Sequence, residues 1–402
     1  MAGAPNRPQN LRDAYSNAQP HVKAALDAIL EEAHKQALEV LAGRRSAVEH
    51  PQLVVAWAML NPGVAALETQ LAHFGPNLRH VDRHGAIWGT GKYEQLDPGW
   101  SEALVEFIEY RDNKAAFRTT PVIIDVPDTT TLALAGDWGT GFWRVGTGAE
   151  GVAKHINANR PDYTVHLGDV YYAGKQAEEE EFVRLWPRGM RGSFTLNSNH
   201  EMYSGAHTFY DQALAPGGPF ETQNRNSYFA LRNRNWVLIG LDTAYYASPD
   251  KLYNEGAIDD AGQGAFLCRL GAEVAGRRVI ILSHHEGFDL KGETLTPLWN
   301  QVTGALGRVP DYWYWGHAHN AVVYRAHDND KGLCRCVGHG AIPYGPAADL
   351  AGAAHVDWSE TKVAGDASLP ERVLNGYARI SLDGATLAEK LIGEDGSVRW
   401  SR

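Results

Sequence analysis

The sequence is poor in cysteine and has no long apolar segment. It contains only three cysteines, Cys268, Cys334 and Cys336, and the Cys-x-Cys pair lacks the second pair that a structural zinc site would need. We therefore expect reduced thiols, with Cys334 and Cys336 buried in a strand pair. No stretch is apolar for long enough to span a bilayer, and the first ten residues lack a basic segment followed by an apolar one. These absences favour a cytoplasmic protein with no membrane association.

Long runs of lysine and arginine are also missing. The net charge is -11, from 48 acidic and 37 basic residues, which argues against nucleic acid as a stable partner. An anionic substrate is still compatible with this charge, because bound cations can reverse the local potential. Hydrophobic residues make up 44% and charged residues 21%, as in ordinary folded proteins, and this composition does not indicate an oligomeric state.

The chain divides into two parts by its hydrophobic pattern. At 402 residues it is long enough for one or two domains. Apolar residues three and four positions apart predict helices at residues 22–43, 51–63 and 100–114. We therefore predict an N-terminal helical module over residues 1–120, packed as a small bundle beside the main domain.

Residues 121–402 show a different pattern, with short β-branched and apolar runs separated by helix-compatible stretches. Strands are predicted at residues 122–127, 129–136, 163–168, 193–197, 236–242, 277–283 and 312–316. Helices fit residues 149–160 and 261–276, and residues 375–400 alternate around Asp-Gly turns as in a terminal β-meander. The predicted fold class is α/β, with layered mixed β-sheets flanked by helices forming one catalytic domain.

Polar residues of a particular kind come directly after these strands. In open α/β sheets ligands bind beyond the carboxyl ends of the strands, so loops distant in sequence can converge there. Carboxylates can bridge two cations, imidazoles bind iron, zinc or manganese, and an asparagine carbonyl adds a neutral oxygen. Two metal ions about 3.5–4 Å apart can activate water and clamp a phosphoryl group. The residues in question are Asp137, Asp169, Asn199, His284, His317 and His319.

Five ordered motifs give these residues a recognisable context. They are Gly136-Asp137-Trp138-Gly139, Gly168-Asp169-Val170-Tyr171-Tyr172, Asn199-His200-Glu201, His284-His285 and Gly316-His317-Ala318-His319. Together they resemble the calcineurin-like metallophosphoesterase superfamily over roughly residues 130–325. GDxG in place of GDxH, together with GDxxY, is similar to the purple acid phosphatase branch, in which the tyrosine binds ferric iron.

The resemblance implies a dinuclear metal centre with Fe(III) beside Fe(II), Zn or Mn. Asp169 would bridge the two ions, and a metal-bound hydroxide would attack phosphorus. By the family pattern the first ion would be bound by Asp137, Tyr172 and His319, and the second by Asn199, His284 and His317.

The residues that follow Asn199 have implied roles in catalysis. His200 would bind the phosphate and protonate the leaving oxygen, a role that suits an imidazole near its working pH, and Glu201 would orient His200. Tyr203, His207 and His285 are candidates for the substrate cleft.

Each of these residues also has an ordinary structural interpretation. An aspartate beside a glycine is commonly a turn or cap residue, so the interpretation of Asp137 and Asp169 as metal ligands depends on the ordered set of motifs. Tyr172 could pack its ring and hydrogen-bond its hydroxyl, with Tyr171 beside it. His285 could donate a hydrogen bond at the edge of the site or fill space next to His284.

Two departures from the family pattern stand out. Ser198 occupies a position where the family usually has glycine, and serine tolerates tight backbone geometry less well. The first 120 residues do not resemble the β-sandwich that precedes the catalytic domain of large plant purple acid phosphatases.

We expect a phosphomonoesterase acting on a small-molecule phosphoester. A phosphodiesterase on the same scaffold is the nearest alternative, since a diester only needs room for a second ester group. A non-catalytic regulator that binds a protein partner through residues 11–118 is the alternative from another class.

Overall fold

A computed structural model describes residues 111–140, 148–273, 276–326, 332–342, 344–366 and 370–402, together with positions 20, 80–81, 87–88, 103, 106–107 and 109–110. The helices predicted at residues 22–43 and 51–63 lie outside this part. Positions 103, 106–107 and 109–110 are helical, as predicted for residues 100–114. A short antiparallel pair, β1 (His80–Val81) with β2 (Ile87–Trp88), lies within the stretch predicted to be helical, and the prediction missed it. The domain boundary near residue 120 stays a prediction.

An eight-stranded mixed sheet forms one half of the domain. Its central strands β8, β9, β10 and β12 are parallel to one another, and β7 pairs antiparallel to β8 but parallel to β3. At the other edge, β11 pairs antiparallel to both β12 and β13. In spatial order the strands are β13 (Val356–Ser359), β11 (Ala321–Tyr324), β12 (Leu333–Val337), β10 (Tyr312–Trp315), β9 (Arg278–Ser283), β8 (Trp236–Gly240), β7 (Phe229–Arg232) and β3 (Val122–Asp125).

A six-stranded mixed sheet forms the other half. Strands β4, β5 and β6 are parallel, and the C-terminal meander β14–β15–β16 adds antiparallel strands next to β4. The order is β16 (Val398–Ser401), β15 (Thr386–Gly393), β14 (Gly376–Asp383), β4 (Thr129–Ala135), β5 (Tyr163–His166) and β6 (Gly192–Thr195). The predicted terminal meander is confirmed.

The two sheets pack face to face because alternate residues of each strand point to opposite faces. In β9, Ile280 and Leu282 face the layer between the sheets, while Val279 and Ile281 face the helices on the outer side. Both faces of β9 are therefore buried, which explains its nearly continuous apolar sequence. Mixed α/β architecture with two mixed sheets flanked by helices is confirmed.

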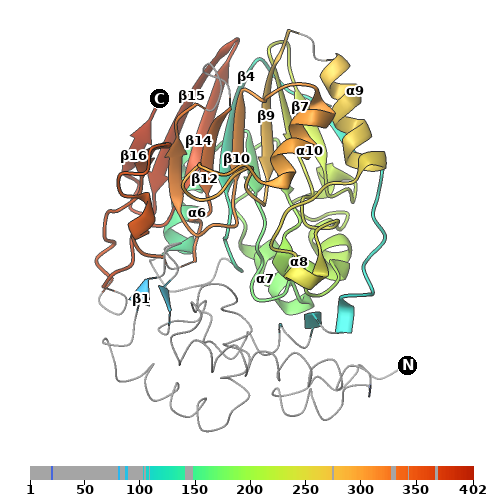
Figure 1. Cartoon of the computed structure of the whole chain (residues 1–402), viewed down its shortest axis with the longest axis horizontal. Coiled ribbons are helices and arrows are strands. Elements are labelled where there is room, and N and C mark those ends of the chain that lie inside the picture. The colour runs from blue at the N-terminus through green and yellow to red at the C-terminus, as the bar shows by residue number, and fades with distance from the viewer. Residues whose placement is uncertain are drawn as a thin grey trace.

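Helices cover the outer faces of the sheets. On the eight-stranded sheet lie α9 (Ala265–Glu273) and α10 (Pro297–Leu306), and α6 (Ala149–Asn159) and α7 (Gln176–Leu185) pack in the cluster on the six-stranded side (Figure 1). Helix α10 begins with proline and ends at Gly307 in a left-handed conformation, as helix caps prefer. The remaining helices are short: α8 (Asn199–Met202), η2 (Phe209–Ala213), η3 (Glu221–Gln223), η4 (Pro249–Lys251), η5 (Asp260–Gly264) and η6 (Ala348–Leu350).

Several elements were not predicted from the sequence. They include strands β7, β11 and β13, which have four residues each. Cys334 and Cys336 lie in β12 and are buried, as expected. Within the described part of the chain, none of the helices combines the length and apolarity needed to cross a bilayer.

Candidate metal centre

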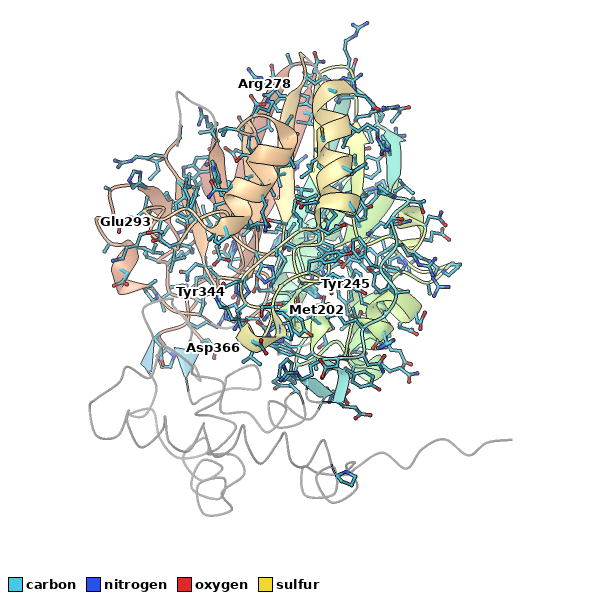
Figure 2. All side chains as sticks on the ribbon, turned by 45° about the vertical axis from the view of Figure 1, so that its right-hand side comes forward. Met202, Tyr245, Arg278, Glu293, Tyr344 and Asp366 are labelled. Carbon is cyan, nitrogen blue, oxygen red and sulfur yellow. The ribbon has the colours of Figure 1, made fainter. Side chains whose placement is uncertain are left out.

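The loops that carry the predicted metal ligands come from both sheets. Asp137 follows β4, Asp169 follows β5 and Asn199 begins α8 after β6, and these three strands are parallel neighbours. His284 follows β9, and His317–His319 follows β10, the parallel neighbour of β9. Arg278, at the start of β9, lies near the top of the view in Figure 2, and Met202 of α8 lies well below it. The carboxyl ends of the two groups of strands therefore meet at one edge.

His284 is the centre of one group of ligand atoms. Its Nε2 lies 2.8 Å from Oδ1 of Asn199, 3.1 Å from Nδ1 of His317 and 3.2 Å from Oδ1 of Asp169. Its Nδ1 donates to the carbonyl oxygen of Leu167 at 2.8 Å, and burial lowers the pKa of His284 to about 3. The imidazole is thus neutral, with the lone pair of Nε2 directed at the other three side chains, as in metal-binding histidines.

The amide of Asn199 is oriented by two further residues. Its Nδ2 donates to the hydroxyl of Tyr203 at 3.3 Å and to Oδ1 of Asn254 at 3.2 Å, which turns Oδ1 of Asn199 towards His284. Tyr203 is 3% exposed and supports Asn199, and a contact of Tyr203 with substrate stays a prediction. Asn254 carries no motif, so nothing in the sequence indicated its part in the site.

A second group of ligand atoms gathers around His319. Its Nε2 lies 3.4 Å from Oδ1 of Asp137 and 2.7 Å from the hydroxyl of Tyr171, and that hydroxyl donates to Oδ2 of Asp169 at 3.0 Å. Asp169 thus presents Oδ1 to the His284 group and Oδ2 to the His319 group. We call the six residues of the two groups the edge cluster: Asp137, Asp169, Asn199, His284, His317 and His319.

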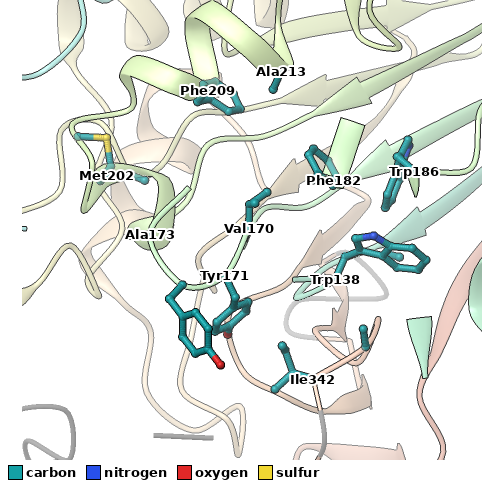
Figure 3. Packing of buried hydrophobic residues seen from close by; sticks show 14 of the residues in the cluster. Trp138, Val170, Tyr171, Ala173, Phe182, Trp186, Met202, Phe209, Ala213 and Ile342 are labelled. Carbon is teal, nitrogen blue, oxygen red and sulfur yellow. The ribbon is translucent and has the colours of Figure 1, made fainter. Parts of the chain in front are cut away.

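The tyrosine that reaches the edge cluster through its hydroxyl is Tyr171. The motif spacing had pointed to Tyr172, whose carbonyl oxygen accepts a hydrogen bond from Nδ1 of His200 at 2.7 Å. The ring of Tyr171 packs against that of His200 at 4.1 Å, and Figure 3 shows it in the buried cluster near Ile342. Two adjacent tyrosines follow Asp169 in the sequence, and only their side-chain directions distinguish them. These contacts make Tyr171 a candidate for the role that the resemblance implies for Tyr172, and metal binding by Tyr172 stays a prediction.

The charges of the edge cluster suit a cation. Both carboxylate oxygens of Asp137 are buried and have no hydrogen-bond donor in good geometry among the described residues. Burial, followed by the charge of Asp169, raises the pKa of Asp137 well above its usual range. For Asp169, burial acts in the same direction, but His200, His284 and His317 outweigh it and leave the pKa well below the usual range. Buried carboxylate oxygens next to imidazole nitrogens form the donor set of a transition-metal site.

The spacing of these atoms also fits metal binding. Candidate ligand atoms lie within 4.8 Å of one another in two sets, one formed by Asp137, Asp169 and His319 and the other by His284, His285 and His317. Nitrogen and oxygen ligands bind zinc at about 2.0–2.2 Å, so ligands of one ion lie about 3 Å apart, as around His284 Nε2. The family pattern of two ions is therefore compatible with the residues present.

Three residues of the edge cluster have left-handed backbone conformations. The φ angles are 55° at Asp137, 78° at Asp169 and 65° at His317. Such values are uncommon outside glycine and tend to occur at functional sites, where the surrounding structure holds them in place.

Glycines allow the loops to approach closely. Gly168 has φ +99°, and a Cβ there would lie 2.7 Å from Nδ1 of His284. A Cβ at Gly316 would lie 2.7 Å from Oδ2 of Asp137. Any side chain at either position would therefore displace a predicted metal ligand.

His200 and Glu201 occupy different surroundings. Nδ1 of His200 donates to the Tyr172 carbonyl, and its Nε2 faces Oδ2 of Asp169 at 3.9 Å. Glu201 contacts the hydroxyl of Ser198, and its role in orienting His200 stays a prediction. Burial, followed by the charge of Asp169, raises the pKa of Glu201 to about 8. Ser198 itself has φ -134°, an extended conformation that does not require glycine.

Two predicted cleft histidines have internal partners. His285 is buried; its Nε2 donates to the carbonyl of Tyr253 at 2.8 Å, which leaves Nδ1 to accept from the Thr243 hydroxyl at 2.9 Å. Both ring nitrogens are thus engaged, which favours the supporting interpretation. His207 contacts the carbonyl of Asn113 through Nε2 at 2.9 Å. A substrate contact by either histidine stays a prediction.

The access side of the edge cluster is formed by the loop after β10. Asp137, Asp169, Asn199 and His284 are buried, whereas His317–His319 is only half-buried. This loop therefore carries the most exposed residues of the edge cluster.

Comparison with known proteins identifies the domain. Residues 130–321 match the family described as calcineurin-like phosphoesterase, so this part of the chain carries a metallophosphoesterase domain. Proteins of this family generally bind a dinuclear metal centre. No curated protein matches the chain.

Several solved structures are similar over much of the chain. GAP50, the anchor in the inner membrane complex of Plasmodium, is 14% identical with a TM-score of 0.47 and covers 68% of this chain and 88% of its own. A predicted phosphoesterase from Streptococcus pneumoniae is 10% identical with a TM-score of 0.30, covering 69% and 98%. A putative 5'-nucleotidase from Staphylococcus aureus, solved with alpha-ketoglutarate, is 11% identical with a TM-score of 0.31, covering 65% and 51%. TM-scores below 0.5 establish neither a shared activity nor a shared substrate.

Proposed function

We propose that this protein is a dinuclear metal-dependent phosphomonoesterase acting on a small-molecule phosphoester. The observation that carries the proposal is that the two carboxylate oxygens of Asp169 face different groups of ligand atoms. One of its oxygens lies 3.2 Å from Nε2 of His284, and the other lies 3.0 Å from the hydroxyl of Tyr171, which itself contacts His319. A carboxylate placed in this way is suited to bridge two cations.

Each group of ligand atoms would hold one ion. Asp137, Tyr171 and His319 would bind the first, and Asn199, His284 and His317 the second. When bound, the ions would lower the pKa of water and neutralise the charge of the phosphoryl group. The protein contributes a buried, preorganised site in which these charges need little rearrangement during the reaction.

His200 would hold and transfer the proton. Its Nδ1–H is committed to the carbonyl of Tyr172, which fixes the ring and leaves Nε2 directed towards the edge cluster. Burial lowers the pKa of His200, with the charge of Asp169 acting in the opposite direction. A dianionic phosphate nearby would favour the protonated ring further, so that Nε2 could donate its proton to the departing alkoxide.

For the first ion we propose Fe(III), with Fe(II), Zn or Mn as the second. A phenolate is a hard anionic ligand that favours the ferric state. The visible spectrum should then show a tyrosinate-to-iron band that Tyr171→Phe removes. Tyr172→Phe is the matched control, since it deletes the neighbouring hydroxyl and should keep the band. A colourless, fully active protein containing only divalent metals would refute the ferric proposal and leave the hydrolase proposal intact.

A hydrolysis assay tests the proposed reaction. The metal-loaded protein should hydrolyse p-nitrophenyl phosphate faster than bis-p-nitrophenyl phosphate, and chelation should stop both reactions. Faster hydrolysis of the diester would identify a phosphodiesterase instead. If a metal-loaded protein showed no turnover with a broad phosphoester panel and bound a protein through residues 11–118, the regulator hypothesis would replace the enzyme.

A further inference from the structure

The hydroxyl of Ser198 contacts several functional residues at once. Its Oγ donates to Oδ1 of Asp169 at 2.6 Å and accepts from the backbone N–H of His200 at 3.1 Å, and it also contacts the carboxyl of Glu201. Ser198 is therefore the N-cap of α8, the short helix that carries Asn199 and His200. One hydroxyl thus connects the bridging carboxylate to the element that presents two other site residues.

The direction of this hydroxyl is fixed by packing. Ser198 is completely buried, and its Cβ lies against Gly168, where an added Cβ would be 2.8 Å away. With φ -134° and ψ 177° the backbone is extended, so the position has no conformational need for glycine. The serine side chain therefore adds a contact to Asp169 that glycine would lack, without straining the backbone.

Ser198 contacts the carboxylate oxygen of Asp169 that faces His284. Oδ1 of Asp169 lies 3.2 Å from Nε2 of His284, while Oδ2 accepts from Tyr171. With Ser198 donating to Oδ1, each oxygen is held by its own hydroxyl, which prevents the carboxylate from rotating about its χ2 angle. Outer hydrogen bonds of this kind orient metal ligands and influence metal affinity.

We propose that Ser198 is a positioning residue that holds the Asp169 carboxylate so that one oxygen faces each group of ligand atoms. This inference rests on the proposed two-metal function. It predicts that removal of the hydroxyl weakens metal binding by about 10- to 100-fold, the range found for outer-shell partners of metal ligands.

The test compares Ser198→Ala with Ser193→Ala in the full chain. Ser193 is an equally buried serine of β6, which accepts from Thr164 Oγ1 at 2.8 Å and from the N–H of Gly189 at 3.1 Å. Both variants lose a buried hydroxyl, so both should lower the thermal midpoint of the metal-free protein. Mn²⁺ affinity, measured by competition with a chromogenic chelator, should fall only in Ser198→Ala.

Ser198→Gly gives a second, independent variant, since the extended backbone accepts glycine and the Asp169 contact is again removed. Equal Mn²⁺ affinity in wild type, Ser198→Ala and Ser198→Gly would overturn the inference, as would an equal loss of affinity in Ser193→Ala. If wild type itself binds no Mn²⁺, Zn²⁺ or iron, the result contradicts the proposed two-metal function and not the contact between Ser198 and Asp169.

Discussion

The domain contains two buried clusters of charged residues, and they differ in whether each charge has a partner of opposite sign within the cluster. Between the sheets, Arg335 donates to both oxygens of Glu389, at 3.0 and 2.5 Å, and the hydroxyl of Tyr314 donates to the same carboxylate at 2.7 Å. We call these three residues the inter-sheet cluster. Its guanidinium and carboxylate balance each other, and the remaining donors of Arg335 reach backbone carbonyls.

Most of the edge cluster is also buried, but its charges are not balanced in the same way. Its two carboxylates lie beside imidazoles, and burial keeps His284 neutral. The oxygens of Asp137 have no donor in good geometry among the described residues. A buried charge without compensation is costly, so the ion pair of the inter-sheet cluster is complete as it stands, whereas the edge cluster offers donor atoms suited to a cation from solution. Four predictions test this difference.

The largest effect is expected for Asp169→Ala. Because Asp169 faces both groups of ligand atoms, its loss should abolish hydrolysis and lower the metal content at both positions. Metal analysis of the purified variant and a phosphatase assay measure the two effects. Retention of one full equivalent of metal together with activity would show that Asp169 does not bridge.

The next largest effect is expected for His200→Ala, because His200 lies beside the edge cluster but is not one of the predicted metal ligands. Both metals should remain bound, while turnover should fall by about 10²–10⁴-fold, the usual contribution of a general acid. The loss should be greatest for esters with poor leaving groups, since a basic alkoxide depends most on protonation. A series of phenyl phosphates with graded leaving groups measures this trend, and loss of metal would instead identify His200 as a ligand.

Arg335→Met should affect stability without affecting metal binding. It leaves Glu389 buried without its partner, which should cost about 3–5 kcal/mol in the free energy of unfolding. Urea denaturation of the metal-free protein measures the cost, and Mn²⁺ affinity should be unchanged. The double variant Arg335→Met/Glu389→Leu is the control and should recover most of the loss, because neither charge is then left alone.

The smallest effect is expected for Asp137→Asn in the metal-free protein. The raised pKa of Asp137 means that the folded state binds a proton more tightly than the unfolded state does. Wild-type stability should therefore fall as pH rises above the ordinary carboxyl pKa, and the variant should lose this dependence. At neutral pH we expect the variant to be more stable by about 0.5–2 kcal/mol, a common gain when a functional residue is replaced. Chemical unfolding at several pH values measures it, and a destabilised variant would contradict the prediction.

The sequence alone was informative about the order of the elements and the kinds of ligand. Continuous apolar runs, such as those of β4 and β9, predicted strands correctly because burial on both faces demands them. The position of Asp137, Asp169 and His284 directly after such strands was enough to predict that they converge. Strand β7 reads Phe-Ala-Leu-Arg, without a β-branched residue, and it was missed although β5, of the same length, was predicted.

Side-chain direction was decided only by the tertiary structure. Tyr171 and Tyr172 are adjacent and identical in chemistry, and the sequence does not say which hydroxyl reaches Asp169 and His319. Asn254 orients Asn199 from a loop 55 residues away, which no local pattern can indicate. Motif spacing thus determined which residue types gather at the edge of the sheets. The backbone conformation and packing around each loop determined which atoms face one another, because those depend on contacts between segments that are remote in sequence.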